Sequence, residues 1–255
     1  MIRFSACIEA LYRNSPFIER IEKVAAVGMK AFEFWGWGNK DIDAIKAAKD
    51  KFGLQVATFG ADVGGALVEP ANRVKLSEGL KRSIEVAYKL DCRRLLVTTG
   101  NEIQGVSREQ QHQSIVDGLR VAAKIVEAAG ITLCLEPLNI LVNHKGYYLY
   151  TSAEGFQIID EVGSPNVKLL FDIYHQQITE GNLIANITAS IGKISHFHVA
   201  DVPGRHEPGT GEINYKNVFK AISDSGYDGF VGLEFWPVCP DDDALKALLD
   251  MTKDL

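Results

Sequence analysis

The sequence has few cysteines, no long apolar run and no excess of basic residues. Its four cysteines, Cys7, Cys92, Cys134 and Cys239, lie far apart and form no CxxC pair, so we expect reduced thiols in a cytoplasmic protein. No apolar run approaches the roughly 18–20 residues that span a bilayer. The first residues also lack the apolar core of a signal peptide. We therefore expect neither a disulfide scaffold nor a membrane protein.

The charge balance is acidic. The 255 residues carry a net charge of −6, and the sequence pI is about 5.6. Such a chain is a poor general binder of phosphate backbones or anionic membranes, so we expect no nucleic-acid partner and no membrane partner. Hydrophobic residues at 46% and charged residues at 24% are typical of a globular fold. Because no linker or low-complexity segment divides the chain, we predict one domain over residues 1–255.

Eight short β-rich runs alternate with stretches of helical period. They are mostly apolar, as expected of strands buried on both faces. Over residues 107–129 apolar positions recur every three or four residues, and Ser107 with Gln110 predicts a capping box at the start of that helix. The eight predicted strands are Ile2–Ile8, Ala31–Trp35, Leu54–Gly60, Arg94–Thr98, Ile131–Glu136, Val167–Asp172, Ile194–Ala200 and Gly229–Phe235.

Eight strand–helix units in 255 residues predict an α/β protein of the (β/α)8 TIM barrel type. A doubly wound open sheet is the main alternative, but the GxGxxG fingerprint that such sheets often carry after their first strand is absent. In a (β/α)8 barrel the active site lies at the carboxyl ends of the strands. The functional residues should therefore follow the predicted strands.

Four residues with metal-ligand chemistry stand at the ends of four successive predicted strands. They are Glu136, Asp172, His198 and Glu234, separated by 36, 26 and 36 residues. Each follows apolar residues, and burying three carboxylates together is costly without a compensating cation. Three carboxylates and one imidazole suit Mn²⁺, Co²⁺ or Mg²⁺ better than the thiolate-rich sites that zinc prefers. The pattern predicts one divalent metal ion.

Two other interpretations concern the same positions. A single carboxylate at a strand end more often caps a helix or joins an ion pair, although four on adjacent strands favour a shared site. His196 neighbours His198 along the strand, and we expect it to point away from the barrel interior if His198 points inward. We assign His196 no metal role.

At these residues the sequence resembles the sugar isomerase and epimerase barrels related to xylose isomerase, and most closely the hydroxypyruvate isomerase branch. The resemblance is carried by residues 202–215 (VPGRHEPGTGEINY) and by the strand-end motifs Glu136-Pro137-Leu138-Asn139, Asp172-Ile173-Tyr174-His175 and Gly232-Leu233-Glu234-Phe235. It covers essentially the whole chain, with its most specific motifs in the final third.

The resemblance implies roles for matching positions. Glu136, Asp172, His198 and Glu234 would hold one divalent metal, and Glu136 and Glu234 would exchange protons with the substrate from opposite sides. Two further residues, His175 and Arg205, would bind substrate oxygens. One position departs from the pattern: some members of the hydroxypyruvate isomerase branch carry glutamine where this chain has His198, and related ketose 3-epimerases typically have histidine there.

These residues suit chemistry beside a carbonyl group. A cation chelated by a carbonyl and a neighbouring hydroxyl stabilises the enediolate formed on proton loss, and a carboxylate takes the proton as general base. Returning it to the neighbouring carbon isomerises the substrate, whereas protonation of the opposite face of the same carbon epimerises it. Arg205 has the planar fork that clamps a substrate carboxylate, or it pairs with Glu207 or Glu212 instead. His175 either donates to a substrate oxygen or is a buried structural histidine.

Aromatic side chains follow several predicted strands. We expect these residues to wall the mouth of the barrel, with Trp35, Phe59 and Trp236 in contact with substrate; the full set is Phe34, Trp35, Trp37, Phe59 and Trp236. Packing in the core or between helices is the alternative for each of them. Such walls also exclude water from the reacting carbon.

The leading hypothesis is a metal-dependent isomerase of a small hydroxycarbonyl substrate, with hydroxypyruvate to tartronate semialdehyde first. A 3-epimerase of free ketoses, of the tagatose or allulose type, or an isomerase of a related sugar acid comes next. More distant alternatives are a metal-dependent endonuclease acting at abasic sites and a barrel without turnover. The number of subunits is left open, with a homo-oligomer among the options.

Overall fold

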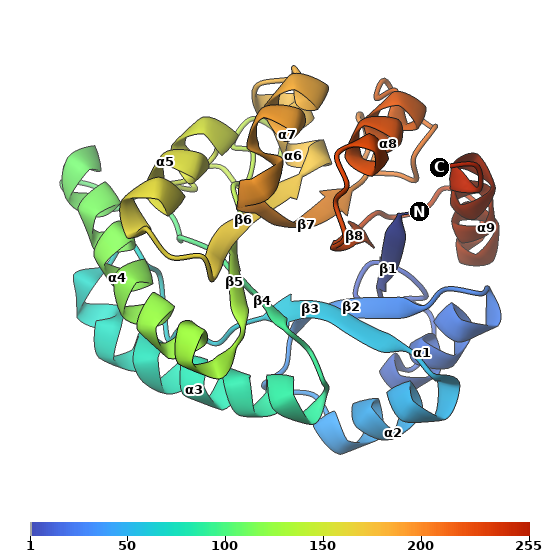
Figure 1. Ribbon diagram of the computed structural model, residues 1–255, viewed down its shortest axis with the longest axis horizontal. Helices are drawn as coiled ribbons and strands as arrows, with labels where there is room; N and C mark the ends of the chain where they lie inside the picture. Colours follow the sequence, from blue (N-terminus) through green and yellow to red (C-terminus); the bar gives the residue numbers. More distant parts are fainter. Residues whose placement is uncertain (1) are drawn as a thin grey trace.

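The computed structural model describes residues 2–255 and has the predicted (β/α)8 architecture (Figure 1). Eight parallel strands close into a barrel in sequence order, and each predicted strand is confirmed to within two residues at either end. The strands are β1 (Arg3–Cys7), β2 (Ala31–Gly36), β3 (Gln55–Gly60), β4 (Arg94–Val97), β5 (Thr132–Leu135), β6 (Val167–Asp172), β7 (Ile194–Val199) and β8 (Phe230–Leu233).

Closure of the barrel decides between the two predicted sheet types. β1 pairs in parallel with β2 on one side and with β8 on the other, where Ser5 lies opposite Gly232. An open doubly wound sheet leaves two unpaired edges, so that alternative is wrong. Pairing β1 with β8 also brings residues more than 200 positions apart into one layer of the barrel interior.

Helices surround the strands on the outside of the barrel (Figure 1). The predicted capping box is present in α4: the Ser107 side chain accepts from Gln110 N while the Gln110 side chain accepts from Ser107 N. Gly130 ends that helix with φ of 61°, a left-handed conformation that glycine adopts without strain. The helices are α1 (Phe17–Ala26), α2 (Ile42–Phe52), α3 (Arg73–Lys89), α4 (Arg108–Ala129), α5 (Ser152–Val162), α6 (Ile173–Thr179), α7 (Leu183–Ser190), α8 (Tyr215–Asp224) and α9 (Asp241–Thr252), with short 3₁₀ turns at Pro70–Asn72 and Ile191–Lys193.

The core lies between the strands and the helices. On α4 the inward residues Ile115, Leu119, Ala122 and Val126 are fully buried, as their helical spacing predicts. Every residue of β7 is buried, which explains why that strand reads as apolar except for its two histidines and Ser195. Polar side chains inside the barrel therefore need partners there.

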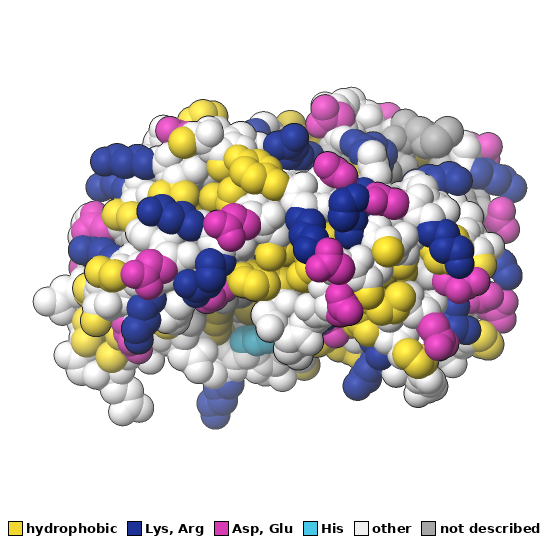
Figure 2. Space-filling view, turned by 90° about the horizontal axis from the view of Figure 1, so that it is seen from below, with side chains coloured by type: hydrophobic (Ala, Val, Ile, Leu, Met, Phe, Trp, Pro, Cys, Tyr) yellow, Lys and Arg dark blue, Asp and Glu magenta, His cyan; other side chains and the backbone are white. Residues whose placement is uncertain are grey.

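Two surface observations bear on partners. Within residues 2–255, none of the helices has both the length and the apolar composition that crossing a membrane requires. The face in Figure 2 carries Lys and Arg side chains interspersed with Asp and Glu, so neither sign of charge forms a continuous stripe on that face.

Candidate functional site

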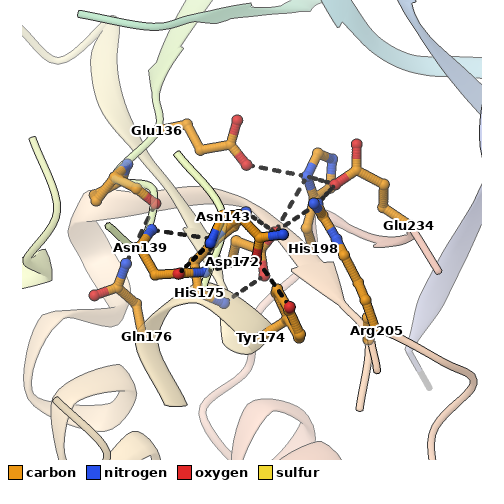
Figure 3. A network of polar contacts seen from close by, with 12 residues as sticks. Glu136, Asn139, Asn143, Asp172, Tyr174, His175, Gln176, His198, Arg205 and Glu234 are labelled. Carbon is orange, nitrogen blue, oxygen red and sulfur yellow. Dashed lines mark hydrogen bonds and ion pairs between the residues drawn. The ribbon is translucent and has the colours of Figure 1, made fainter. Parts of the chain in front are cut away.

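The four predicted metal ligands lie together at the carboxyl end of the barrel (Figure 3). Glu136 follows β5, Asp172 ends β6, His198 belongs to β7 and Glu234 follows β8. One ligand atom from each of the four buried residues lies within 4.8 Å of the others. The Nδ1 atom of His198 is 3.3 Å from Glu136 Oε1, 3.6 Å from Glu234 Oε2 and 4.0 Å from Asp172 Oδ2.

This donor set fits a divalent cation. Three carboxylates and an imidazole nitrogen from four strands face one small volume, and oxygen-rich sets of this kind suit Mn²⁺, Mg²⁺ or Co²⁺. Burying three carboxylates side by side is unfavourable unless positive charge compensates them. The buried acidic and histidine groups are thus able to bind a metal ion.

The pKa values of two of these groups are raised, for different reasons. Burial, opposed by His198, raises the pKa of Glu136 to about 7. Burial alone would lower the pKa of His198, but the carboxylates of Glu234 and Glu33 outweigh it, and the pKa lies well above its usual range. In the metal-free protein both groups therefore hold protons up to near-neutral pH or beyond.

The backbone around Glu136 is fixed by a buried tyrosine. The hydroxyl of Tyr147 donates to the carbonyl oxygen of Glu136 at 3.0 Å and accepts from the backbone N–H of Thr99 at 2.8 Å. Glu136 N donates to the Val97 carbonyl at 3.1 Å. The position of the carboxylate is thus tied to two neighbouring strand ends.

Asp172 has two roles, because each of its oxygens faces a different partner. Oδ1 caps α6 by accepting from the backbone N–H of His175 at 3.1 Å. Oδ2 faces the cluster, 4.0 Å from His198 Nδ1 and 3.6 Å from the ring nitrogen Nε2 of His175. The helix-cap interpretation and the metal-ligand interpretation are therefore compatible at this residue.

His175 lies in the first turn of α6 and is fully buried. Its Nδ1 accepts from the backbone N–H of Asn139 at 3.1 Å and lies 2.7 Å from the Asn139 side-chain nitrogen. Because an acceptor nitrogen carries no proton in neutral imidazole, the proton is on Nε2. Nε2 has no hydrogen-bond partner in the described part of the chain. Burial and then Arg205 lower the pKa of His175 well below its usual range, so the ring is neutral.

Arg205 reaches into the same cavity from the loop after β7. Its guanidinium pairs with Glu234 and lies 3.7 Å from Asp172 Oδ2. It also lies over the rings of Tyr174 and Trp236, at 5.1 and 4.9 Å from their centroids. This is the one predicted substrate residue with a permanent positive charge.

The loop that presents Arg205 is held by Asp201. The Asp201 carboxylate accepts from the backbone N–H groups of Val202, Gly209 and Ile213 at 2.8 to 3.1 Å. Arg205 itself has φ of 59°, an uncommon value for a residue with a side chain. The predicted alternative for Arg205 is wrong, because its guanidinium pairs with neither loop glutamate.

Aromatic residues wall a cavity of about 420 Å³ in front of the cluster. Trp35 is 46% exposed, and its Nε1–H donates to Glu234 Oε1 at 2.5 Å. Trp37 does not line this cavity, since its Nε1–H donates to Ser83 Oγ at 3.0 Å on the outer side of the strands. The lining residues include Phe34, Trp35, Phe59, Leu96, Leu138, His144, His175, Arg205 and Trp236 as well as Glu136, His198 and Glu234.

Two buried residues next to the cluster differ from the sequence-based expectation: His196 points the other way, and Glu33 was not among the predicted site residues. His196 does not point away from His198: its ring centroid is 5.1 Å from that of His198, inside the barrel. The expectation was wrong because residues two apart on a strand share a face. Both rings contact Glu33, a carboxylate in β2 that is 2% exposed. The signal for Glu33 was available, since it is the one charge in the apolar run of residues 31–35.

Comparison with known proteins identifies the family. The family of xylose isomerase-like TIM barrels matches residues 21–255. The chain belongs to this family. Hydroxypyruvate isomerase of Escherichia coli (strain K12) is 35% identical over 244 residues, 93% of this chain and 94% of that protein. A 2-oxo-tetronate isomerase of Cupriavidus necator is 32% identical over 244 residues, with the same two shares.

Solved structures of similar proteins have the same fold. A crystal structure described as AP endonuclease, family 2, from Brucella melitensis has a TM-score of 0.94 at 30% identity and covers 99% of both chains. D-psicose 3-epimerase from Clostridium cellulolyticum H10, crystallised with D-tagatose, has a TM-score of 0.84 at 22% identity over 99% of this chain and 98% of that one, which shows the fold alone. The sequence relatives that are named isomerases show that this protein is an isomerase.

Proposed function

We propose that this isomerase converts a small hydroxy-keto acid, with hydroxypyruvate to tartronate semialdehyde as the leading reaction, and that it uses one divalent cation. The observation that carries the proposal is the Arg205 guanidinium, which shares the cavity with Glu136, His198 and Glu234 and lies 3.7 Å from Asp172 Oδ2. A carboxylate clamp beside a cation site suits a substrate that combines an acid group with a hydroxycarbonyl group. The name of the E. coli relative supports the same substrate class.

Glu136, Asp172, His198 and Glu234 would hold the cation, Mn²⁺, Mg²⁺ or Co²⁺. When bound, it would supply the positive charge that stabilises an enediolate. The residues of the chain do the rest, namely orientation of the substrate, exclusion of water and transfer of the proton.

The proton moves between two neighbouring carbons. One carboxylate of the pair Glu136 and Glu234 takes a proton from the hydroxymethyl carbon of hydroxypyruvate, and the electron pair of that C–H bond enters the enediolate. A proton is then returned to the former carbonyl carbon, while the hydroxyl proton of the hydroxymethyl group moves to the former carbonyl oxygen, so the hydroxymethyl carbon becomes the aldehyde. Burial raises the pKa of Glu136 before a cation binds, and the positive charge of a bound cation would lower it, so the carboxylate would be ionised and able to accept the proton of that C–H bond.

Binding groups fix which carbon faces these carboxylates. Arg205 would hold the substrate carboxylate through two parallel hydrogen bonds. His175, with its proton on Nε2, would donate to a substrate oxygen, since Asn139 occupies the other ring nitrogen. The walls formed by Phe34, Phe59 and Trp236 would keep water from the enediolate.

A direct test follows the C–H bond. Incubated in deuterated water with Mn²⁺ or Mg²⁺, the protein should convert hydroxypyruvate to tartronate semialdehyde. Deuterium should appear at the former carbonyl carbon of the product. Chelation of the metal should abolish both. Absence of exchange with every metal would count against the proposal, and unchanged turnover in EDTA would remove the cation from it.

Arg205→Met tests the acid clamp separately. Loss of a charged hydrogen bond of about 1.5–3 kcal/mol should raise KM for hydroxypyruvate by about 10- to 100-fold. KM for a neutral ketose should change much less. Equal changes for both substrates would argue against a carboxylate at Arg205.

A ketose 3-epimerase is the second candidate, favoured by histidine rather than glutamine at position 198. The ratio of kcat/KM for hydroxypyruvate to that for D-allulose or D-tagatose decides between the two. The endonuclease interpretation has less support, because the net charge is −6 and Figure 2 shows both signs of charge interspersed on one face.

A further inference from the structure

A second group of polar residues lies directly behind the four clustered donors. Its centre is the carboxylate of Glu33 in β2, which accepts from the Ser5 hydroxyl at 2.6 Å. Glu33 Oε2 is 3.0 Å from His196 Nε2, and Glu33 Oε1 is 2.8 Å from His198 Nε2. All four residues are buried in the barrel interior, where a carboxylate without such partners would be costly.

The two nitrogens of His198 face different carboxylates. Nδ1 faces Glu136, Asp172 and Glu234, whereas Nε2 faces Glu33. A neutral imidazole has one N–H and one lone pair, and an ionised carboxylate only accepts hydrogen bonds. Carboxylates face both nitrogens, so only a cation among Glu136, Asp172 and Glu234 makes them unequal. With that cation bound, Nδ1 would supply the lone pair, and the N–H would lie on Nε2, where Glu33 Oε1 at 2.8 Å is the facing acceptor. That is the orientation a metal ligand needs.

The neighbouring strand leaves room for this contact. Gly232 in β8 lies opposite His198 in β7 and opposite Ser5 in β1. A Cβ atom on Gly232 would come within 2.4 and 2.6 Å of the two Glu33 oxygens and 2.7 Å of His198 Cδ2. Real Cβ atoms essentially never approach that closely, so any larger residue would displace the pair. The contact between Glu33 and His198 therefore has its own space in the barrel.

We infer that Glu33 is a positioning residue for His198, fixing its proton on Nε2 and aiming Nδ1 at the cation. The inference rests on the proposed function, since it concerns the same metal site. A carboxylate behind a ligating histidine orients the ring and makes it a stronger ligand, and removing such a partner typically costs about 10- to 100-fold in metal affinity.

The first test measures Mn²⁺ affinity by competition with a chelator. Glu33→Gln keeps the shape of the side chain but removes its charge, and it should weaken Mn²⁺ binding by about 10- to 100-fold. The matched control is Glu207→Gln, a buried glutamate that accepts from Val238 N and Cys239 Sγ away from the cluster, and its Mn²⁺ affinity should stay within about twofold of wild type. Equal affinity for wild type and Glu33→Gln overturns the positioning role alone. Absence of Mn²⁺ binding by wild type overturns the proposed metal site and the inference with it.

A double-mutant cycle separates positioning from simple charge attraction. If Glu33 acts through the imidazole, Glu33→Gln should cost little further affinity in a His198→Gln background. The same loss in both backgrounds would mean that the charge of Glu33 acts on the cation directly. Two equivalents of Mn²⁺ bound by wild type, with Glu33, His196 and His198 forming a second site, would also overturn the inference.

A third measurement needs no substitution at Glu33. With ¹⁵N-labelled histidine and Mg²⁺, the His198 signal, assigned by its loss in His198→Gln, should show the proton on Nε2. A proton on Nδ1 would contradict the inference even if Glu33→Gln does not fold.

Discussion

His198 and His175 are both buried next to Asp172, but different ring nitrogens approach its Oδ2 atom, Nδ1 in His198 and Nε2 in His175. His198 stands on a strand, has Glu33 behind it and turns Nδ1 toward the carboxylates. His175 stands in the first turn of α6, has Asn139 behind it and turns Nε2 toward Asp172. A carboxylate behind the ring leaves a lone pair for a cation, whereas an N–H behind the ring leaves a proton for a substrate oxygen. On this proposal, the partner behind each ring sets which nitrogen carries the proton.

The largest expected loss of activity comes from substitution of Asp172, the carboxylate that both histidine rings face. Asp172→Asn keeps an oxygen that caps α6 but removes the charge that faces both rings. We expect kcat/KM to fall by about 10³-fold or more, because metal binding and substrate binding are both impaired. The melting temperature and the Mn²⁺ affinity of the variant should be measured alongside its kinetics. Activity within tenfold of wild type would separate Asp172 from the site.

His175→Phe should affect the substrate side alone. The variant keeps an aromatic ring of similar size but loses the Nε2–H donor, so kcat/KM should fall by about 10²-fold. Mn²⁺ affinity should remain within about threefold of wild type, because Asn139 and not a ligand contacts the other nitrogen. A parallel fall in Mn²⁺ affinity would show that the two histidines are not separate in function.

Acidification should weaken metal binding by protonating His198 and Glu136. Glu136, whose pKa burial raises to about 7, and His198, whose pKa is also raised, hold protons that a cation must displace. Affinity should thus rise with pH and fall by about tenfold per proton for each unit below pH 7. Calorimetry in buffers of different protonation enthalpy measures the protons released. His175→Phe should retain this dependence, and affinity that is constant between pH 6 and 8 would contradict it.

The smallest effect is expected from Gly232→Ala. Its Cβ would press on Glu33 and His198, and we expect a loss of stability of about 1–3 kcal/mol. Metal affinity should fall by less than about tenfold, while KM for substrate changes little. A variant with wild-type metal affinity and a wild-type melting temperature would show that the backbone at this position shifts without cost to accommodate the added Cβ.

Much of this arrangement could be predicted from the sequence. Glu136, Asp172, His198 and Glu234 each end an apolar run at intervals of about one strand–helix unit, and parallel strands bring such ends to one edge. Arg205 and His175 also reach the cavity as the resemblance implied. The local rules suffice here because each signal lies within one strand and its following loop.

Other features could not be predicted, or were predicted wrongly. The contact of Glu33 with His198 joins positions 165 residues apart and exists only because β1, β2, β7 and β8 meet where the barrel closes. Asn139 meets His175 only through the packing of the loop after β5 against α6. The direction of His196, by contrast, follows from the strand period alone, because residues two apart on a strand lie on the same face.

By itself, the sequence determined the strands, the helices, the order in which they follow one another and the kind of chemistry at the strand ends. Periodic burial and capping are local properties of the chain, so they can be recognised without a structure. Only the tertiary structure decided which atoms of His198 and His175 face the cavity, since each ring nitrogen takes its role from a partner on a distant segment.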